Sequence, residues 1–228
     1  MNFKHSLALV LFCFLAQQTA AQSDFTFGLL PAINLNKKLA RDIRLNFKIE
    51  SRQALKQGFF QDNNPLQYNY TLTDLSFLTA KKIGIHEHVA FGYLIRFKEN
   101  EVIHRTIQQF IFSKKNNGLR LAHRVATDQT YSSSEETTFR LRYRIATEIP
   151  LNGDTVDPTE WYIKLNHEYL QSLQNGKYDL ETRLIPFFGY MLSPKHKVEV
   201  GLDYRLNNFL SGTPSHRFWT SFNWYYSF

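Results

Sequence analysis

The last twelve residues of the chain alternate between two faces. Counting back from Phe228 in steps of two gives an almost wholly aromatic face, and the residues between are mostly polar. Successive side chains of a β-strand point to opposite sides of the sheet, so a period of two predicts a strand. The chain therefore ends in a strand with one apolar face. That face consists of Phe218, Thr220, Phe222, Trp224, Tyr226 and Phe228.

The same alternation recurs along the chain. It is clearest in 137–149, where Phe139, Leu141 and Tyr143 alternate with arginines. Turn-forming residues separate such stretches, which begin about every nineteen residues, as expected of ~10-residue membrane strands joined by turns. The candidate strands are 24–36, 42–52, 67–81, 86–98, 102–113, 119–131, 137–149, 161–170, 179–192, 198–206 and 217–228.

The amino terminus indicates export. A positive charge at Lys4 precedes an apolar run, Ser6 to Ala16, and a small-residue motif ends at Ala21. This is the pattern of a cleaved signal peptide, and the run is too short for a membrane helix, which needs about 20 apolar residues. We expect a signal peptide over residues 1–21 and a single domain over 22–228.

Composition narrows the class of protein. Cys13 is the only cysteine and leaves with the signal peptide, so no disulfide can stabilise the mature chain. Without Lys4, the 27 Lys and Arg become 26, against 20 Asp and Glu. For an exported chain, this basic balance indicates lipopolysaccharide phosphates or an anionic solute as partners, and not nucleic acid. No mature segment is apolar enough for a membrane helix, so a membrane-spanning form must be a closed barrel.

Alternation by itself fits two folds, because a soluble barrel turns its apolar face inward and a membrane barrel turns it outward. The aromatic terminal strand, the export signal and the aromatic residues near strand ends favour the membrane barrel. We therefore predict an all-β protein, a single antiparallel transmembrane β-barrel of about ten to twelve strands in the outer membrane of a Gram-negative cell. A soluble, periplasmic, lipocalin-like binding protein is the alternative.

The order of turns leaves one difficulty. Bacterial barrels usually have an even number of strands, with both chain ends in the periplasm. Counting back from Phe228 places short turns on the periplasmic side and longer loops outside, although 150–160 is long for a periplasmic turn. By the same count, the stretch 24–36 runs inward from the outside of the cell. Either this stretch is not a regular barrel strand, or one strand has been missed or split. The short turns are 37–41, 81–85, 114–118 and 193–197, and the longer loops are 54–66, 132–136, 171–178 and 207–216.

The chain resembles known membrane proteins in two places. Its terminal residues Phe222, Trp224, Tyr226 and Phe228 resemble the assembly signal of bacterial outer-membrane barrels. The opening Asp24 to Leu29, the turn Asn36 to Leu39 and strands dense in Arg, Lys and Tyr are similar to the domain-of-unknown-function 2490 family of Bacteroidota-type barrels. The resemblance implies outer-membrane lipid, lipopolysaccharide and the barrel-assembly machinery as partners. It implies no catalytic residue, because the family has no established activity.

The polar residues form no catalytic or metal-binding pattern. His104 and His123 lack the adjacent serine that a nucleophilic site on a strand requires. His86 and His88 share one strand face and suit a metal, but a solvated turn explains them without one. We therefore expect no catalytic residue, no cofactor and no metal. An outer-membrane enzyme that hydrolyses lipid or peptide is the alternative function.

Five arginines form a basic ladder on one face of two neighbouring strands. Turned toward lipid, each would cost about 2–4 kcal/mol at the membrane midplane, so we expect them inside the barrel. They either form a structural network with inward carboxylates or line a path for anions. The function we expect is thus a structural barrel or a passive channel for small solutes. The ladder is Arg120, Arg124, Arg140, Arg142 and Arg144, and the carboxylates are Glu168, Glu181, Glu199 and Asp203.

Overall fold

The structure is a computed structural model that describes residues 23–116, 119–208, 210 and 213–228. The expected signal peptide lies outside these residues. No helix in the described ranges has the length and apolar character to cross a membrane. The strands are β1 (Asp24–Lys38), β2 (Ile43–Phe59), β3 (Asn69–Lys82), β4 (Glu87–Lys98), β5 (Glu101–Asn116), β6 (Leu119–Tyr131), β7 (Thr138–Pro150), β8 (Glu160–Gln174), β9 (Lys177–Ser193), β10 (His196–Asn207) and β11 (Ser215–Ser227).

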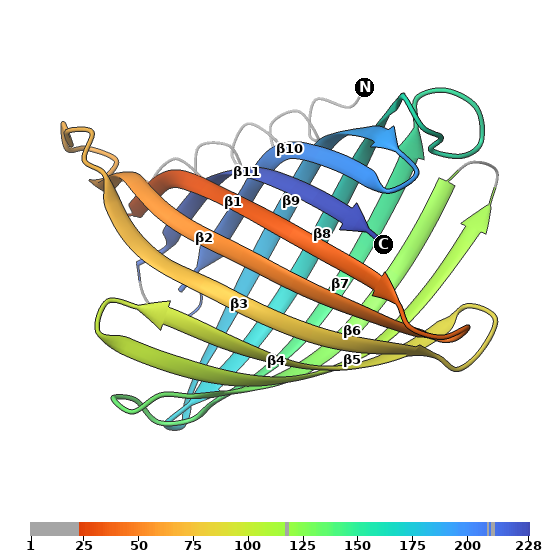
Figure 1. Cartoon of the computed structure of the whole chain (residues 1–228). Helices are drawn as coiled ribbons and strands as arrows, with labels where there is room; N and C mark the ends of the chain where they lie inside the picture. The colour runs from red at the N-terminus through yellow and green to blue at the C-terminus, as the bar shows by residue number, and fades with distance from the viewer. Residues whose placement is uncertain (1–22, 117–118, 209, 211–212) are drawn as a thin grey trace, which may run out of the picture.

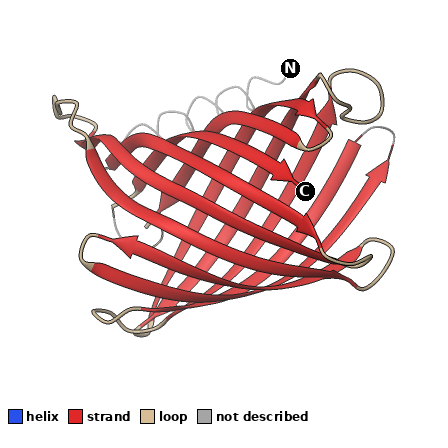
Figure 2. Cartoon of the chain, in the orientation of Figure 1, coloured by secondary structure: helices blue, strands red, loops and turns tan. Residues whose placement is uncertain are grey.

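The eleven strands form one closed barrel (Figure 1). Strands and the loops between them make up the whole described chain (Figure 2). Each strand pairs with its neighbours in sequence, and ten of the eleven pairs are antiparallel. The prediction of an all-β barrel of about ten to twelve strands is confirmed.

The barrel closes through a parallel pair of strands, which we call the seam. The prediction of a wholly antiparallel barrel is therefore wrong at this pair. Strand β1 lies parallel to β11, from Asp24 opposite Ser215 to Asn36 opposite Ser227. The reason is the odd number of strands, since alternating directions then bring the first and last strands together with the same direction. The stretch 24–36 is therefore a strand of the barrel. It runs from the N-terminal end to the C-terminal end, which is the direction that the count of turns had given.

The two ends of the barrel carry different sets of turns. The C-terminal end holds Phe228 and the connections 39–42, 83–86, 151–159 and 194–195. The opposite end, called the N-terminal end, holds Asp24 and the connections 60–68, 99–100, 132–137, 175–176 and 208–214.

One predicted loop is wrong. Most of 171–178 is strand, and only Asn175 and Gly176 connect β8 to β9. Both residues have positive φ, 48° and 71°, as the tight turns of β-hairpins require. The rule of long loops at one end therefore does not hold for this connection, and the nine residues 151–159 make a long loop at the other end.

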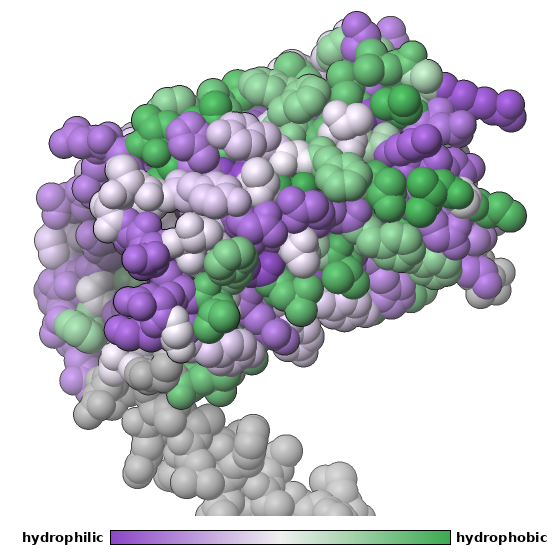
Figure 3. Space-filling model, turned by 90° about the horizontal axis from the view of Figure 1, so that it is seen from below, coloured by the Kyte–Doolittle hydropathy of each residue, from purple (hydrophilic) through white to green (hydrophobic). Residues whose placement is uncertain are grey.

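Most charged side chains of the strands face the interior of the barrel and most large apolar side chains face outward, although a small apolar cluster of Leu30, Ala54 and Trp219 is buried. On β7, the outward Phe139, Leu141 and Tyr143 are 55%, 45% and 39% exposed. Inside, Asp128 and Glu168 are almost wholly buried. Figure 3 shows hydrophobic side chains over much of the outer wall. This is the reverse of a soluble barrel, whose apolar faces fill the core.

Candidate functional site

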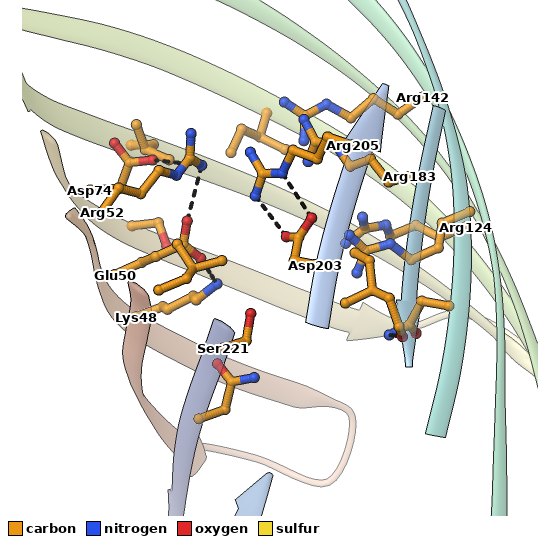
Figure 4. A pocket seen from close by; sticks show the side chains of 18 of the residues that line it. Lys48, Glu50, Arg52, Asp74, Arg124, Arg142, Arg183, Asp203, Arg205 and Ser221 are labelled. Carbon is orange, nitrogen blue, oxygen red and sulfur yellow. Dashed lines mark hydrogen bonds and ion pairs between the residues drawn. The ribbon is translucent and has the colours of Figure 1, made fainter. Parts of the chain in front are cut away.

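The barrel encloses a polar cavity of about 350 Å³ to which every strand contributes at least one residue. Its most frequent lining residue is arginine, and only four carboxylates line it: Glu50, Asp74, Glu181 and Asp203. Figure 4 shows charged side chains from several strands converging on this space. The basic lining residues are Lys48, Arg52, Arg96, Arg105, Arg124, Arg140, Arg142, Arg144, Lys164, Arg183, Arg205 and Arg217.

Half of these cations come from four consecutive strands, β4 to β7, and form what we call the arginine wall. Alternation along β7 sends three of them to the same face, because they are spaced by two. The neighbouring strands add the others at positions fixed by the antiparallel register. The wall consists of Arg96, Arg105, Arg124, Arg140, Arg142 and Arg144.

Asp128 on β6 holds three members of the wall. Its carboxylate lies 2.6 Å from Arg140, 2.8 Å from Nε of Arg142 and 3.6 Å from Nε of Arg105. Thr130 adds a neutral acceptor, since its Oγ1 receives hydrogen bonds from Arg105 at 2.9 Å and Arg140 at 2.6 Å. Asp128 is 2% exposed, so a single buried negative charge lies among three positive ones.

Glu168 on β8 organises a second group. Its Oε2 lies 2.8 Å from both Arg124 and Arg144, and its Oε1 lies 3.3 Å from Arg183. Arg183 also pairs with Glu181. Glu168 is completely buried, and like Asp128 it does not line the cavity. Both carboxylates therefore lie behind the guanidinium groups that they orient.

The rest of the cavity lining is closer to neutral. Arg96, at the edge of the arginine wall, donates two hydrogen bonds of 2.7 Å to Asp74, its partner in register on β3. Arg205 binds Asp203 in the same two-pronged way, at 2.8 and 2.7 Å. Glu50 pairs with Lys48 and, at 3.1 Å, with Arg52, as the dashed lines in Figure 4 show.

A third buried carboxylate, Glu199, is fully engaged. It receives hydrogen bonds from Tyr162 at 2.8 Å, from Lys164 at 3.0 Å and from Tyr225 at 3.0 Å. Tyr162 has no exposed surface because its ring lies flat over Gly189 of the neighbouring strand, where a Cβ atom would come within 2.3 Å of the ring. This cluster fills part of the interior on β8, β10 and β11.

The charges of the lumen do not balance. Twelve basic residues line the cavity, whereas seven carboxylates pair with them or share its lining, which leaves a surplus of five positive charges among the described residues. Arg217 makes no ion pair within 4 Å in the described part of the chain, and its strand neighbour in register is another arginine, Arg205. A cavity of this kind attracts anions.

The structure divides the five-residue ladder that the sequence suggested. Arg124, Arg140, Arg142 and Arg144 line the cavity together, whereas Arg120 is exposed near the C-terminal end, opposite Glu148. All four expected carboxylates lie in the charged network of the lumen: Glu168, Glu181, Glu199 and Asp203.

Sequence reasoning missed several cations of the lumen. Arg96 alternates with apolar residues on β4, so the pattern that revealed β7 was available for it too. Arg105 was harder to place, because Ile107, Phe110 and Ile111 make the facing of its strand ambiguous. Its burial shows that it points inward.

The residues of the expected assembly signal lie on the outside of the terminal strand, whereas Trp219 and Tyr225 of the same strand face inward. Phe222, Trp224 and Phe228 are 45%, 38% and 53% exposed. The rings of Trp224, Tyr226 and Phe228 stack in sequence, with centroid separations of 6.3 and 5.5 Å. They form a continuous apolar ladder beside the parallel seam.

The histidines considered as ligands or bases lie elsewhere. His104 and His123 each share a hydrogen bond with a tyrosine, Tyr93 at 2.7 Å and Tyr143 at 2.8 Å. Within the described ranges, no three His, Cys, Asp or Glu side chains are placed to hold a metal ion.

Comparison with known proteins places the chain in a family. No curated protein and no solved structure matches it. Residues 27–217, most of the barrel, match the model of the family described as protein of unknown function (DUF2490). The chain therefore belongs to the DUF2490 family.

Proposed function

We propose that the protein is an integral outer-membrane β-barrel whose lumen is a passive path for small anions. The observation that carries this proposal is the inverted distribution of side chains, with apolar residues outside and a surplus of cations inside. A soluble monomer with such an apolar surface would be prone to aggregate. In a bilayer the same surface contacts lipid, and closure of the sheet satisfies the backbone hydrogen bonds.

The outer surface also supports this placement. Aromatic side chains with polar atoms collect at the interfaces of membrane barrels, where one end of the side chain is in lipid and the other in water. Here Trp161 and Tyr190 lie together near the C-terminal end of the barrel, with ring centroids 4.6 Å apart. Outer-membrane lipid and lipopolysaccharide are the proposed contacts of this surface, and the barrel-assembly machinery the proposed partner of β11.

The width of the barrel limits the solute. Eight strands leave just enough room for side chains, and sixteen or more leave an open aqueous channel. Eleven strands lie between these cases, and the cavity of about 350 Å³ accommodates only a small solute. We propose no catalytic role, because the carboxylates of the lumen are all engaged with arginine or lysine side chains.

Two measurements test the membrane barrel and the path separately. Unboiled protein in detergent should migrate differently from boiled protein, and the native protein should sediment with outer membranes. In planar bilayers under a salt gradient, the reversal potential should indicate a preference for anions. Recovery in the soluble periplasmic fraction would overturn the membrane placement, and absence of conductance would leave the lumen as a structural network only.

A matched pair of variants assigns the selectivity to the lumen. Arg142→Glu changes the charge of the cavity by two and should weaken the preference for anions. Arg120→Glu makes the same change at the exposed end of the barrel and should affect selectivity much less, because exposed charges are screened within about 10 Å at 0.1 M salt. If the two variants change the anion selectivity equally, the selectivity does not originate in the lumen.

A further inference from the structure

The two kinds of basic residue are distributed very differently over this barrel. The chain has 13 arginines and 14 lysines. Ten of the arginines line the cavity, but only two lysines do, Lys48 and Lys164. General attraction of anions requires only positive charge, which both residues supply. A selective use of arginine indicates that the planar, forked arrangement of its N–H donors matters.

The contacts of the arginine wall leave some of its guanidinium donors unused. A guanidinium has five N–H donors. In the described chain, Arg142 and Arg144 contact carboxylates through Nε. Arg140 uses Nε and Nη2 for Asp128 and Thr130. Within the described ranges, no hydrogen bond involves Nη1 of these three residues, so each retains donors for a ligand.

Three buried donors of the lining arginines make no hydrogen bond among the described residues, the Nε–H groups of Arg52, Arg124 and Arg142, although Nε of Arg142 lies 2.8 Å from Asp128. The Nε–H group of Arg124 is buried without a hydrogen-bond acceptor in the described residues, although the side chain lines the cavity. Leaving a buried donor unpaired is destabilising. A turn of the Arg124 side chain that brings this N–H group to an acceptor in the cavity would remove the penalty.

The two carboxylates that hold most of the arginine wall do not line the cavity. Asp128 and Glu168, which hold the wall in place, are 2% and 0% exposed. At the members of the wall that these two residues hold, a ligand therefore meets guanidinium groups, whereas at Arg96 the carboxylate of Asp74 also lines the cavity. Around Asp128, three arginines face one carboxylate, which leaves two positive charges uncompensated at this point.

We propose that the arginine wall is a binding site for a phosphate group, either inorganic phosphate or the phosphate of a small monoester. Arg105, Arg140 and Arg142 form its centre. A tetrahedral dianion offsets two positive charges, and its several oxygens accept paired N–H bonds from more than one fork at once. Chloride has no such oxygens and gains only the electrostatic attraction. This inference rests on the proposed function, because it assigns the class of anion that the path prefers.

Calorimetric titration of the folded, detergent-solubilised barrel tests the site. The probes are sodium phosphate, glycerol 3-phosphate and sodium chloride at constant ionic strength. Phosphate is expected to bind at least tenfold more tightly than chloride. Binding of glycerol 3-phosphate as well would identify the phosphate group as the recognised chemistry, and binding of inorganic phosphate alone would restrict the site to the free ion. Equal affinity for phosphate and chloride would overturn the proposal.

Lysine variants distinguish the effect of the forked guanidinium geometry from the effect of positive charge. Arg140→Lys and Arg142→Lys keep a cation beside Asp128 and should weaken phosphate binding about tenfold, while the anion preference in chloride solutions is retained. Arg120→Lys is the control and should bind phosphate like the unchanged protein. A heat-shifted gel band shows that each variant is folded. Unaltered phosphate affinity in folded Arg140→Lys and Arg142→Lys would overturn the assignment to these residues.

The outcomes also distinguish this proposal from the one on which it rests. A barrel that binds phosphate in detergent but conducts no ions contradicts the path and supports the site. A barrel that conducts anions but does not distinguish phosphate from chloride supports the path and contradicts the site.

Discussion

At the scale of single residues, Asp128 has the greatest influence on the lumen. It is the common partner of Arg105, Arg140 and Arg142, and it is nearly inaccessible to water. Removing the charge of a buried partner leaves uncompensated cations, which typically costs about 3–5 kcal/mol. We expect Asp128→Asn to lower the free energy of unfolding by this amount.

The measurement for this variant is urea unfolding of the barrel in lipid vesicles, followed by tryptophan fluorescence. Asp154→Asn is the matched control, because Asp154 lies exposed in the 151–159 loop and should leave stability unchanged. If Asp128→Asn unfolds at the same urea concentration as the control, Asp128 does not hold the wall.

A second carboxylate acts at the N-terminal end of the barrel. Hydrogen bonds from Ser132 and Ser134 lower the pKa of Glu101 to about 2. The pKa in the unfolded chain is higher, at its ordinary value of about 4.5, so the ionised form stabilises the folded loop above that pH. This contribution should be lost as the pH falls from about 4.5 to about 2. Amide hydrogen exchange at Ser133 and Ser134, corrected for the intrinsic pH dependence, should accelerate over this range.

Glu101→Gln should produce fast exchange at these serines already at neutral pH. Glu136→Gln serves as the control, because no hydrogen bond in the described chain involves the carboxylate of Glu136. Slow exchange in Glu101→Gln would show that the serine loop holds its shape without this carboxylate.

At the scale of elements, strand β11 closes the barrel. It pairs with β10 on one side and β1 on the other, and the Phe228 amide donates a 2.9 Å hydrogen bond to the Asn36 carbonyl. Its outer ladder of aromatic rings ends at Phe228. Phe228→Asp places a charge at this end, and we expect it to reduce the amount of folded barrel in the outer membrane at least several-fold while export continues.

The control for this change is Ser227→Asp, since Ser227 is also exposed but does not belong to the aromatic ladder. Quantitative immunoblotting of outer-membrane and periplasmic fractions measures both variants. Normal membrane levels of Phe228→Asp would remove the role assigned to the terminal residue.

Periodicity in the sequence predicted the strands and their two faces, but not which side chains form ion pairs between strands. Alternation placed Arg140, Arg142 and Arg144 on one face of a strand, and burial of side chains shows that this face is the inner one. Alternation could not identify Asp128 as the partner of Arg140 and Arg142, because ion pairing depends on the register between β6 and β7. The parallel seam was likewise hidden, since the direction of a neighbouring strand leaves no trace in a period of two.

At the scale of the whole molecule, an odd number of strands places the first and the last residue of the barrel, Asp24 and Phe228, at opposite ends of it. Asp24 lies beside Ser215 at the N-terminal end, whereas Phe228 lies at the C-terminal end. A barrel with an even number of antiparallel strands would bring both to the same side. If the C-terminal end faces the periplasm, the start of β1 faces the outside of the cell.

Epitopes at three positions test this arrangement in intact cells. One placed directly before Asp24 and one inserted in the 60–68 loop should both be stained by antibody without permeabilisation, because they share the N-terminal end. One inserted in the 151–159 loop should be stained only after the outer membrane is opened. Staining of the Asp24 epitope together with the 151–159 epitope, and apart from the 60–68 epitope, would require an even number of spanning strands and would contradict the parallel closure of β1 on β11.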